Sequence, residues 1–461
     1  MRGGNRLRSC LLPPLTLTLS PRKSGERESP GILWKRPCRG DIGLDQLLQH
    51  AQKAASADAR AGASFFARVS AFYAAIFLVV GTHMPFLPIW LDWRGLSAAE
   101  IGLVFSAPYF IRLIVTPSVA FLADRRANHR GVIIVLAWGA LASLLAMAPL
   151  RSFWPILCAS SLFTLFWSTV MPLTETVAMR GVRTAGLDYG RMRLWGSVSF
   201  IAASLGGGFI VDWGGPPAAL GIILVGAAAT LIVAHLLPRA GPNESATPAA
   251  GSRLRLADAV RLIGNPLFLL FLFAIGMEQA SHAVFYLFGT LHWRAQGYSA
   301  GTAGMLWAIA VVSEIGVFAY SSWCIGRVGI LGLMLLGAAA GIVRWTAMAL
   351  DPPLGVQMLL QTLHALTYGA AHLGAIHFIG KAVPQAQAGT AQALYATVTS
   401  GIAMGIAMGF SGPVYSVYGG GAYLGMAALA VGALLATLLL RRHWKHGLLI
   451  AGAGVAAQAP R

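Results

Sequence analysis

The chain has 461 residues, of which 56% are hydrophobic and only 11% are charged, against about 25% charged residues in soluble domains. Its formal net charge of +18 could indicate a nucleic-acid partner, but most basic residues lie in the first 64 positions or in short loops between apolar segments. The composition therefore excludes an ordinary soluble domain and a nucleic-acid-binding protein, and it predicts a protein that spans a membrane.

Residues 1–64 differ from the rest of the chain. They are polar, contain prolines and show no period, and the run Leu11–Leu19 is too short and too broken by proline to predict a secretory signal. The stretch Leu12–Glu28 resembles translated intergenic repeat DNA of bacterial genomes. We therefore expect residues 1–64 to be a disordered extension or the product of an over-extended start site.

About twelve apolar stretches of membrane-spanning length follow, and each predicts one transmembrane helix because about 20 apolar residues cross the hydrocarbon core. The expected spans are roughly 66–90, 98–121, 131–150, 153–177, 191–212, 217–237, 266–290, 301–323, 329–349, 354–378, 387–411 and 420–440. They form an N-terminal bundle (65–237) and a C-terminal bundle (265–442). A cytoplasmic linker (238–264) joins the bundles, and a cytoplasmic tail (443–461) follows, which we expect to be disordered at its end.

The basic residues of the loops predict the orientation in the membrane. One set of alternate loops holds most of the Lys and Arg of the membrane region, although Arg327 and Lys381 are alone in theirs, whereas the loops between them hold only Arg94, Arg151 and Arg294. Basic loops remain in the cytoplasm. We therefore expect both termini to be cytoplasmic, in the inner membrane of a bacterium.

The linker has two parts of different character. Residues 241–252 are polar and rich in Gly, Pro and Ser, whereas Arg253–Ile263 alternates basic and apolar residues. The second part predicts a short amphipathic helix on the inner membrane surface. The alternative is that it extends the seventh transmembrane helix beyond the membrane.

A weak internal repeat supports the division into halves. WRGLSAAEIG (Trp93–Gly102) follows the first span, and WRAQGYSAGTAG (Trp293–Gly304) follows the seventh. Each has Trp-Arg, then Ser-Ala, then a glycine where the next helix begins. Parallel six-helix halves are typical of major facilitator transporters.

Longer motifs strengthen this similarity. The N-terminal half contains PLTETVAM (Pro172–Met179) and LDYGRMRLWGSVSF (Leu187–Phe200), and the C-terminal half contains SEIGVF, GIVRW, QTLHALTYGAAH and ALYATVTSGIAMG. These segments resemble the major facilitator superfamily, and most of all its phenylpropionate permease group, which is related to lactose permease and nucleoside–proton symporters. The resemblance covers residues 65–440. It implies an all-α integral membrane protein with twelve transmembrane helices in two six-helix bundles.

The loop after the second span, Ala120–Arg130, resembles the G-x-x-x-D-R-x-G-R-R signature of the superfamily. Asp124 and Arg125 match the signature, whereas Ala120 and Ala127 replace its glycines. The resemblance implies a cytoplasmic latch between the halves, which must break as they rock. The alternative is an ordinary cytoplasmic helix cap.

Glu314, Arg344 and His364 lie near the middle of the eighth, ninth and tenth expected helices. Lactose permease carries Glu, Arg and His on the corresponding helices, so the resemblance implies a role in proton coupling. A further Glu of that protein is replaced here by Thr367, which leaves the proton carrier open. A carboxyl group that gains and loses an arginine partner can load and unload a proton. Glu278 on the seventh helix is the alternative carrier, and a static buried ion pair is the third interpretation.

Other side chains are candidates for substrate binding. Arg112 lies near mid-membrane and needs an anion, which is an acidic side chain or the substrate. Glu175 and Arg193 are similar to a Glu and an Arg that contact the sugar in lactose permease, although both could instead be solvated at the inner interface. An arginine can bind a substrate carboxylate with two hydrogen bonds. The further candidates are His372, Trp345 and Gln361, which lie in the matching motifs.

The sequence gives no sign of a metal site, a cofactor or an enzyme. The four cysteines are scattered, the histidines show no H-x-x-x-H spacing, and HExxH and GxSxG are absent. We expect the proton gradient to be the energy source and the molecule to be a monomer in the bilayer.

We therefore expect a secondary active transporter that imports a small organic substrate by proton symport with alternating access. The group resemblance implies an aromatic or arylalkanoic acid as substrate. The alternatives are a symporter of a sugar or nucleoside, a proton-coupled exporter of amphipathic compounds, and a sensor that binds its substrate without transporting it.

Overall fold

The structure is a computed structural model of the whole chain, and it describes residues 44–126, 128–238 and 256–449. These residues form helices joined by short turns, without a strand. The chain divides into two units, residues 1–56 and 57–461, and the second unit contains all the features discussed below except the start of the first helix.

Seven helices make up the N-terminal half. They are α1 (Leu44–Trp93), α2 (Ala98–Arg125), α3 (His129–Met147), α4 (Phe153–Trp167), α5 (Val170–Ala185), α6 (Tyr189–Gly214) and α7 (Pro216–Leu236). Helix α1 begins at Leu44, so residues 44–64 are helical within the segment 1–64 that we expected to be a disordered or over-extended N-terminus, and that expectation stays a prediction. Residues 1–43 lie outside the described part of the chain.

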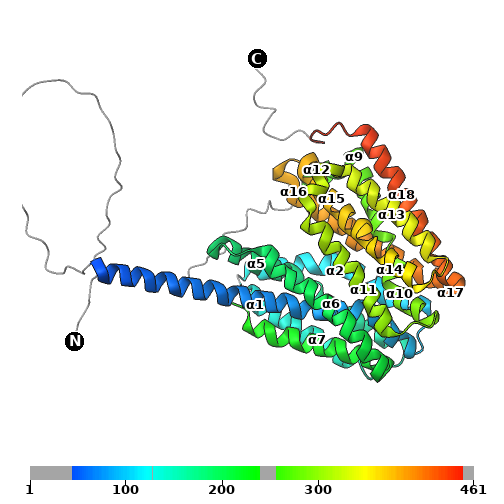
Figure 1. The fold of residues 1–461 in the computed structure, drawn as a ribbon, viewed down its shortest axis with the longest axis horizontal. Coiled ribbons are helices and arrows are strands. Elements are labelled where there is room, and N and C mark those ends of the chain that lie inside the picture. Colours follow the sequence, from blue (N-terminus) through cyan, green and yellow to red (C-terminus); the bar gives the residue numbers. More distant parts are fainter. Residues whose placement is uncertain (1–43, 127, 239–255, 450–461) are drawn as a thin grey trace, which may run out of the picture. The chain divides into compact units, whose positions relative to one another are not determined.

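The C-terminal half contains more breaks. Its α-helices are α8 (Leu256–Ile263), α9 (Pro266–Ala280), α10 (Ala283–Ala295), α11 (Ala300–Ala319), α12 (Ser321–Val328), α13 (Ile330–Met348), α14 (Leu354–Thr362), α15 (Ala371–Ala382), α16 (Ala388–Thr397), α17 (Met404–Tyr418) and α18 (Ala422–His443). Two π-helices, η1 (Ala365–Ala370) and η3 (Val398–Ala403), and two short 3₁₀ turns, η2 (Gln385–Gln387) and η4 (Gly419–Gly421), complete it. Figure 1 shows the C-terminal helices, from green to red, packed beside the N-terminal ones.

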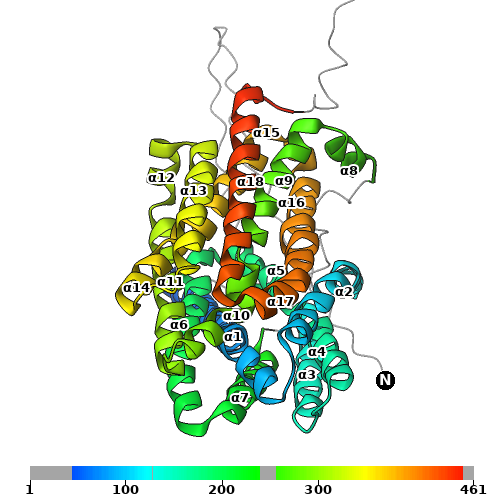
Figure 2. The same cartoon turned by 90° about the vertical axis from the view of Figure 1, so that its right-hand side faces the viewer.

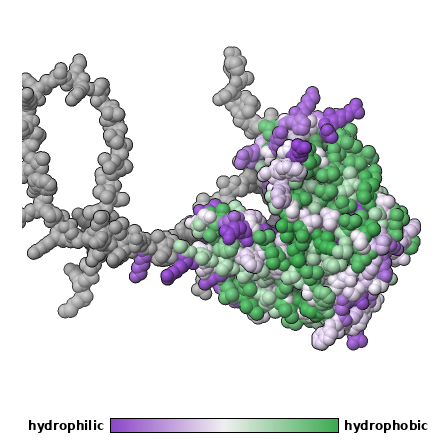
Figure 3. Space-filling model, viewed as in Figure 1, coloured by the Kyte–Doolittle hydropathy of each residue, from purple (hydrophilic) through white to green (hydrophobic). Residues whose placement is uncertain are grey.

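Within the described residues, ten helical stretches are long and apolar enough to cross a membrane. One of them, 385–443, covers two of the expected spans, whereas the expected span 354–378 falls on α14, η1 and α15 and is not among the ten. The count of twelve therefore remains a prediction. Figure 3 shows apolar side chains over much of the visible face of the bundle, with hydrophilic ones gathered near the helix ends.

Polar caps begin several of these helices. The Asn265 side chain accepts hydrogen bonds from the first turn of α9, and the Asp188 side chain does the same for α6. Such caps satisfy backbone N–H groups that have no partner inside the helix. Helix α8 is thus separate from α9, which supports a distinct short helix over an extension of the seventh span.

Helix α8 is anchored to the C-terminal half. Its Leu262 is fully buried in the core of that half, and its Asp258 accepts a hydrogen bond from Gln387 in η2 at 3.0 Å. Val260 and Ile263 are exposed. Figure 2 shows α8 beside the start of α9. The part of the predicted amphipathic helix before residue 256 lies outside the described residues.

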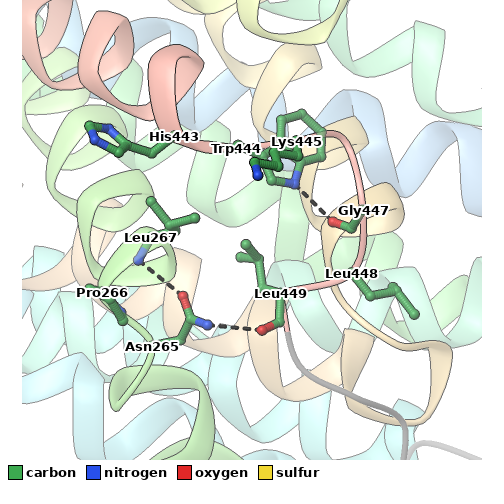
Figure 4. Close-up of a pocket in the computed structure, with 9 residues that line it drawn as sticks. All are labelled: Asn265, Pro266, Leu267, His443, Trp444, Lys445, Gly447, Leu448 and Leu449. Atoms are coloured by element: carbon green, nitrogen blue, oxygen red, sulfur yellow. Dashed lines mark hydrogen bonds between the residues drawn. The ribbon is translucent and has the colours of Figure 1, made fainter. Parts of the chain in front are cut away.

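The chain folds back after α18 instead of ending there. Trp444 is buried, and its indole N–H donates to the carbonyl of Gly447 at 2.8 Å. The Asn265 amide donates to the carbonyl of Leu449 at 2.9 Å, as Figure 4 shows. The described part of the predicted tail is therefore an ordered hook, residues 444–449, which lies on the start of α9 and on the end of α15. Residues 450–461 lie outside the description.

The hydrophobic core shows where the halves are joined. One cluster contains residues of both halves, such as Phe86 and Trp90 of α1 with Phe285 and Tyr423 of the C-terminal half. This shared cluster lies toward the end of the bundle that carries the loops with few basic residues, which we call the predicted outer end. Toward the predicted inner end, each half has a core of its own. The halves are thus packed together at the predicted outer end.

Candidate functional site

Arg344 on α13 is the centre of a buried polar cluster. Its side chain is fully buried and lies over the rings of Phe285 and Trp345. Its guanidinium donates to Gln361 Oε1 at 2.7 Å and to Thr367 Oγ1 at 3.2 Å. Within the described residues no carboxylate forms an ion pair with it, so the predicted direct pairing with a carboxylate is not seen.

His364 links this arginine to Glu314. Nη1 of Arg344 lies 3.1 Å from His364 Nδ1, and the other ring nitrogen, Nε2, lies 3.7 Å from the Glu314 carboxylate. Because a guanidinium only donates hydrogen bonds, Nδ1 must accept, and in the neutral ring the proton is then on Nε2, facing Glu314. The Glu314 side chain is 20% exposed although it lies within a membrane span. The three residues predicted for proton coupling therefore form one connected chain.

Thr367 connects the same cluster to α9. It accepts from Arg344 and lies 3.0 Å from Nε2 of His282, whose Nδ1 lies 3.1 Å from the carbonyl of Glu278. Nδ1 donates to that carbonyl, so Nε2 accepts from the threonine hydroxyl. The position where lactose permease has an acid thus carries a hydroxyl that both accepts and donates.

Glu278, the alternative proton carrier, lies apart from this network. Its side chain is 2% exposed, and both carboxyl oxygens are buried without a hydrogen-bond partner in the described structure. Oε1 faces Gly341 of α13, three residues before Arg344. A carboxyl group buried without partners carries a large desolvation cost. Glu314, unlike Glu278, is within reach of both a polar partner and solvent. The geometry therefore favours Glu314 as the proton carrier.

A row of aromatic and imidazole rings extends from the cluster along one helical face. His364 stacks on Tyr368 with ring centroids 5.4 Å apart, and Tyr368 stacks on His372 at 6.0 Å. His372 Nδ1 then meets the Tyr395 hydroxyl at 2.7 Å. The π-helix η1 lies within this row, and single π turns are frequent at functional sites.

The N-terminal half contributes Arg193. Its guanidinium lies 4.1 Å from the centroid of the Phe77 ring, and it is close enough to interact electrostatically with Glu314 and Tyr368 of the other half. Glu175 accepts a hydrogen bond from the Tyr189 hydroxyl at 2.5 Å. No ion pair between Glu175 and Arg193 occurs among the described residues, so their predicted pairing is not seen. Arg193 instead lies over rings of its own half, Tyr73 and Phe77, and its charge also acts on the polar cluster of the C-terminal half.

Arg112 also bridges the halves. It lies over the ring of Tyr109 on its own helix and donates to the carbonyl of Ser400 in the π-helix η3. Its partner in the structure is thus a backbone oxygen and not the anion that the sequence suggested. This contact belongs to the packing of α2 against α17 and η3.

The remaining predicted residues have different surroundings. Trp345 is fully buried and donates to Ser281 Oγ at 3.1 Å, and Gln361 is fully buried against Arg344. Both therefore position other groups and do not face an open space. Arg125 is exposed at the end of α2, and the side chain of Asp124 lies outside the described residues, so the latch remains a prediction.

Sequence reasoning gave no role to Tyr286 and Tyr368. Each follows a histidine by four residues, His282 and His364, and each stacks on that histidine. The repeated H-x-x-x-Y spacing was a readable signal, because residues four apart share one helix face. An apolar groove of about 460 Å³ between α9, α17 and α18 has no charged side chain in its lining and is separate from this cluster. No group of three metal-binding side chains occurs among the described residues.

Comparison with known proteins agrees with this architecture. The MFS_1 like family matches residues 66–423. The chain is 30% identical to the "Probable 3-phenylpropionic acid transporter" of Escherichia coli (strain K12) over 78% of this chain and 94% of that protein. It is 29% identical to the "Maltose permease" of Geobacillus stearothermophilus over 72% of this chain and 83% of that one.

Solved structures share the fold. The crystal structure of the nucleoside transporter NupG superposes with a TM-score of 0.70, at 20% identity, over 82% of this chain and 100% of that chain. The family is one of transporters and not of enzymes, and the apolar helices make the chain a multi-pass membrane protein. From the family match over most of its length, the chain belongs to the MFS_1 like family of major facilitator transporters.

Proposed function

We propose that the protein imports a small aromatic or arylalkanoic acid together with a proton, by alternating access. The observation that carries this proposal is the chain Glu314–His364–Arg344, in which a partly exposed carboxyl group meets a histidine held by an arginine without a carboxylate partner. The proton gradient would be the energy source, and the protein needs no cofactor for this reaction.

The hydrogen bonds of His364 support the proposed proton coupling. Because Arg344 holds Nδ1 as an acceptor, the neutral ring already carries its proton on Nε2 and cannot take a second one there. The Nε2–H instead faces the Glu314 carboxylate, and Glu314 itself takes up and releases the transported proton. A small movement of α11 against η1 would change the 3.7 Å separation between the Glu314 carboxylate and Nε2. Such a movement within the C-terminal half can alter the affinity of Glu314 for a proton, and so can motion of the halves that changes its distance from Arg193.

An organic anion fits the cations of this site. Arg344 and Arg193 have no ion pair among the described residues, and an unpaired arginine within a membrane is costly. A substrate carboxylate that binds between the halves would neutralise Arg193, which already interacts with Glu314 and Tyr368. The rings of Tyr286 and Tyr368 beside it suit an aromatic group.

The names of the relatives point to more than one substrate class. One relative is named for 3-phenylpropionic acid and another for maltose. A sugar would use hydrogen bonds, such as one to Glu175, more than a cation, and the unpaired arginines favour the acid. The sugar symporter is the second candidate.

External pH in a lightly buffered suspension of de-energised cells that express the protein tests this proposal. We expect transient alkalinisation when 3-phenylpropionate is added and none with empty-vector cells. Alkalinisation with maltose or a nucleoside, but not with the acid, would replace the proposed substrate class. Acidification from cells preloaded with the acid would indicate an exporter. Saturable binding of the acid without any flux would indicate a sensor.

A further inference from the structure

Asp212, near the end of α6, reaches across to the other half of the molecule. One carboxylate oxygen accepts from the backbone N–H of Ala300 at 2.7 Å, and the other accepts from that of Gly301 at 2.7 Å. Ala300 and Gly301 are the first two residues of α11. An N-terminal-half carboxylate thus caps a C-terminal-half helix.

This contact supplies what α11 lacks within its own half. The first N–H groups of a helix have no intrahelical acceptor. Ser299 satisfies one of them, through the hydrogen bond from Thr302 N to its hydroxyl at 3.1 Å. Asp212 satisfies two more and places a negative charge at the positive end of the helix dipole. The cap is therefore complete only while the halves are together.

The surrounding surface is shaped for close contact. A Cβ atom on Gly304 of α11 would overlap the carbonyl oxygen of Ser204 on α6, and one on Gly208 of α6 would overlap the carbonyl of Ala300. Glycine is needed at both positions because the two backbones approach each other directly. The Asp212 bonds thus lie at the edge of a tight backbone interface.

Other contacts at the same end connect the same halves. A Cβ atom on Gly412 of α17 would overlap the carbonyl of Ala98, where α2 begins. Asp92 at the end of α1 interacts electrostatically with Arg294 of the C-terminal half. The shared hydrophobic cluster lies behind these contacts, whereas each half has its own core toward the predicted inner end.

We propose that Asp212 is the positioning residue that holds the predicted outer end closed, and that its release from Ala300 and Gly301 is a required step when that end opens. The inference rests on the alternating access of the proposed function, but not on the identity of the substrate. In this proposal, Asp212 sets the ratio between the state that is open at the predicted outer end and the state that is open at the predicted inner end.

Distances between spin labels at each end of the bundle test the proposal in the full-length protein. Cysteines replace Ser152 and Ala295, exposed residues at the predicted outer end, one in each half. A second pair replaces Ala185 and Arg327, exposed at the predicted inner end. The background carries serine in place of the four native cysteines, which are Cys10, Cys38, Cys158 and Cys324.

In Asp212→Asn we expect a longer distance between the outer labels and a shorter one between the inner labels. The ratio of open to closed outer ends should rise about tenfold, as expected when hydrogen bonds to a charged acceptor are weakened. A merely destabilised protein would instead broaden both distributions without an opposite shift.

Asp351→Asn is the matched control. Asp351 is a carboxylate at the same end, but it accepts from Gln296 at 2.8 Å and lies 2.7 Å from His292 Nε2, both in its own half. The same change of charge there should leave both distances as they are. An outer distance in Asp212→Asn that equals the unmodified one would overturn the proposal.

Gly301→Ala disturbs the same contact from the C-terminal half. It provides a second test if Asp212→Asn does not fold. A Cβ atom there would lie 3.0 Å from Asp212 Oδ2, so the carboxylate has to move. We expect the same opening, and its absence would also overturn the proposal. If the outer end opens in these variants but 3-phenylpropionate causes no change in external pH, the proposed substrate is rejected and the role of Asp212 is kept. If the pH changes but the outer end does not open, the role of Asp212 is rejected and the substrate is kept.

Discussion

Nη1 of Arg344 lies 3.1 Å from Nδ1 of His364, and this contact sets the tautomer of the histidine. Since the guanidinium donates, the free N–H of the neutral ring lies on the side of Glu314. The arginine therefore acts on the carboxyl group through the ring and not by direct pairing. This arrangement separates the roles of the three residues.

Glu314→Gln should abolish uphill accumulation of substrate and spare counterflow exchange. The amide keeps the size of the side chain but binds no proton, so the step that couples flux to the gradient is lost. Accumulation and counterflow of labelled substrate in the same vesicles measure both. Glu100→Gln, at an exposed cap of α2, is the control, and full accumulation in Glu314→Gln would remove Glu314 from the coupling role.

Arg344→Lys should lower the rate of uptake at least tenfold. A lysine cannot make the forked set of bonds to Gln361, His364 and Thr367, and each buried group left unpaired costs about 1–3 kcal/mol. Initial uptake rates, corrected for the amount of folded protein, measure the effect. The exposed Arg327→Lys should transport normally, and an active Arg344→Lys would show that charge alone is enough.

Glu278→Met should stabilise the protein by about 1–2 kcal/mol, because it replaces a carboxyl group buried without partners by an apolar side chain of similar length. Thermal unfolding in detergent measures the change. The companion variant Glu278→Gln should retain proton-driven accumulation. If accumulation is lost while folding is normal, Glu278 and not Glu314 carries the proton.

Trp444→Ala should destabilise the C-terminal half by about 3–5 kcal/mol, as for other large buried aromatic residues. Its indole is 4% exposed and lies against Phe378 with ring centroids 4.7 Å apart. Thermal unfolding in detergent is again the measurement. Leu448→Ala is the control in the same hook, because Leu448 is 58% exposed and should cost little. Equal effects of the two changes would show that the hook does not pack as described.

The sequence could predict the helical membrane fold because long apolar runs and alternating basic loops depend on local composition. It also placed Glu314, Arg344 and His364 on neighbouring helices, and the structure connects them. It did not indicate the helix over residues 44–64, where charged and amide side chains are interspersed with alanine and leucine and no long apolar run occurs. Helix propensity in polar segments is a weaker signal than hydropathy.

Partners of buried charges were harder to predict. Arg112 was expected to need an anion, but a backbone carbonyl of Ser400 in another helix takes that role. Asp212 was not among the predicted site residues, because its partners are two backbone N–H groups 88 and 89 residues away along the chain. Backbone groups look the same at every position of a sequence, so contacts to them emerge only from the fold.

The bond from Arg112 to Ser400 also has a consequence for hydration. A π-helix departs from the regular ladder of backbone hydrogen bonds, and an oxygen there that loses its donor in a membrane needs a replacement. Water is the smallest molecule able to provide one. Parting of α2 from η3 would therefore favour wetting at this point, so that the first water molecules to enter between the halves would gather beside the arginine.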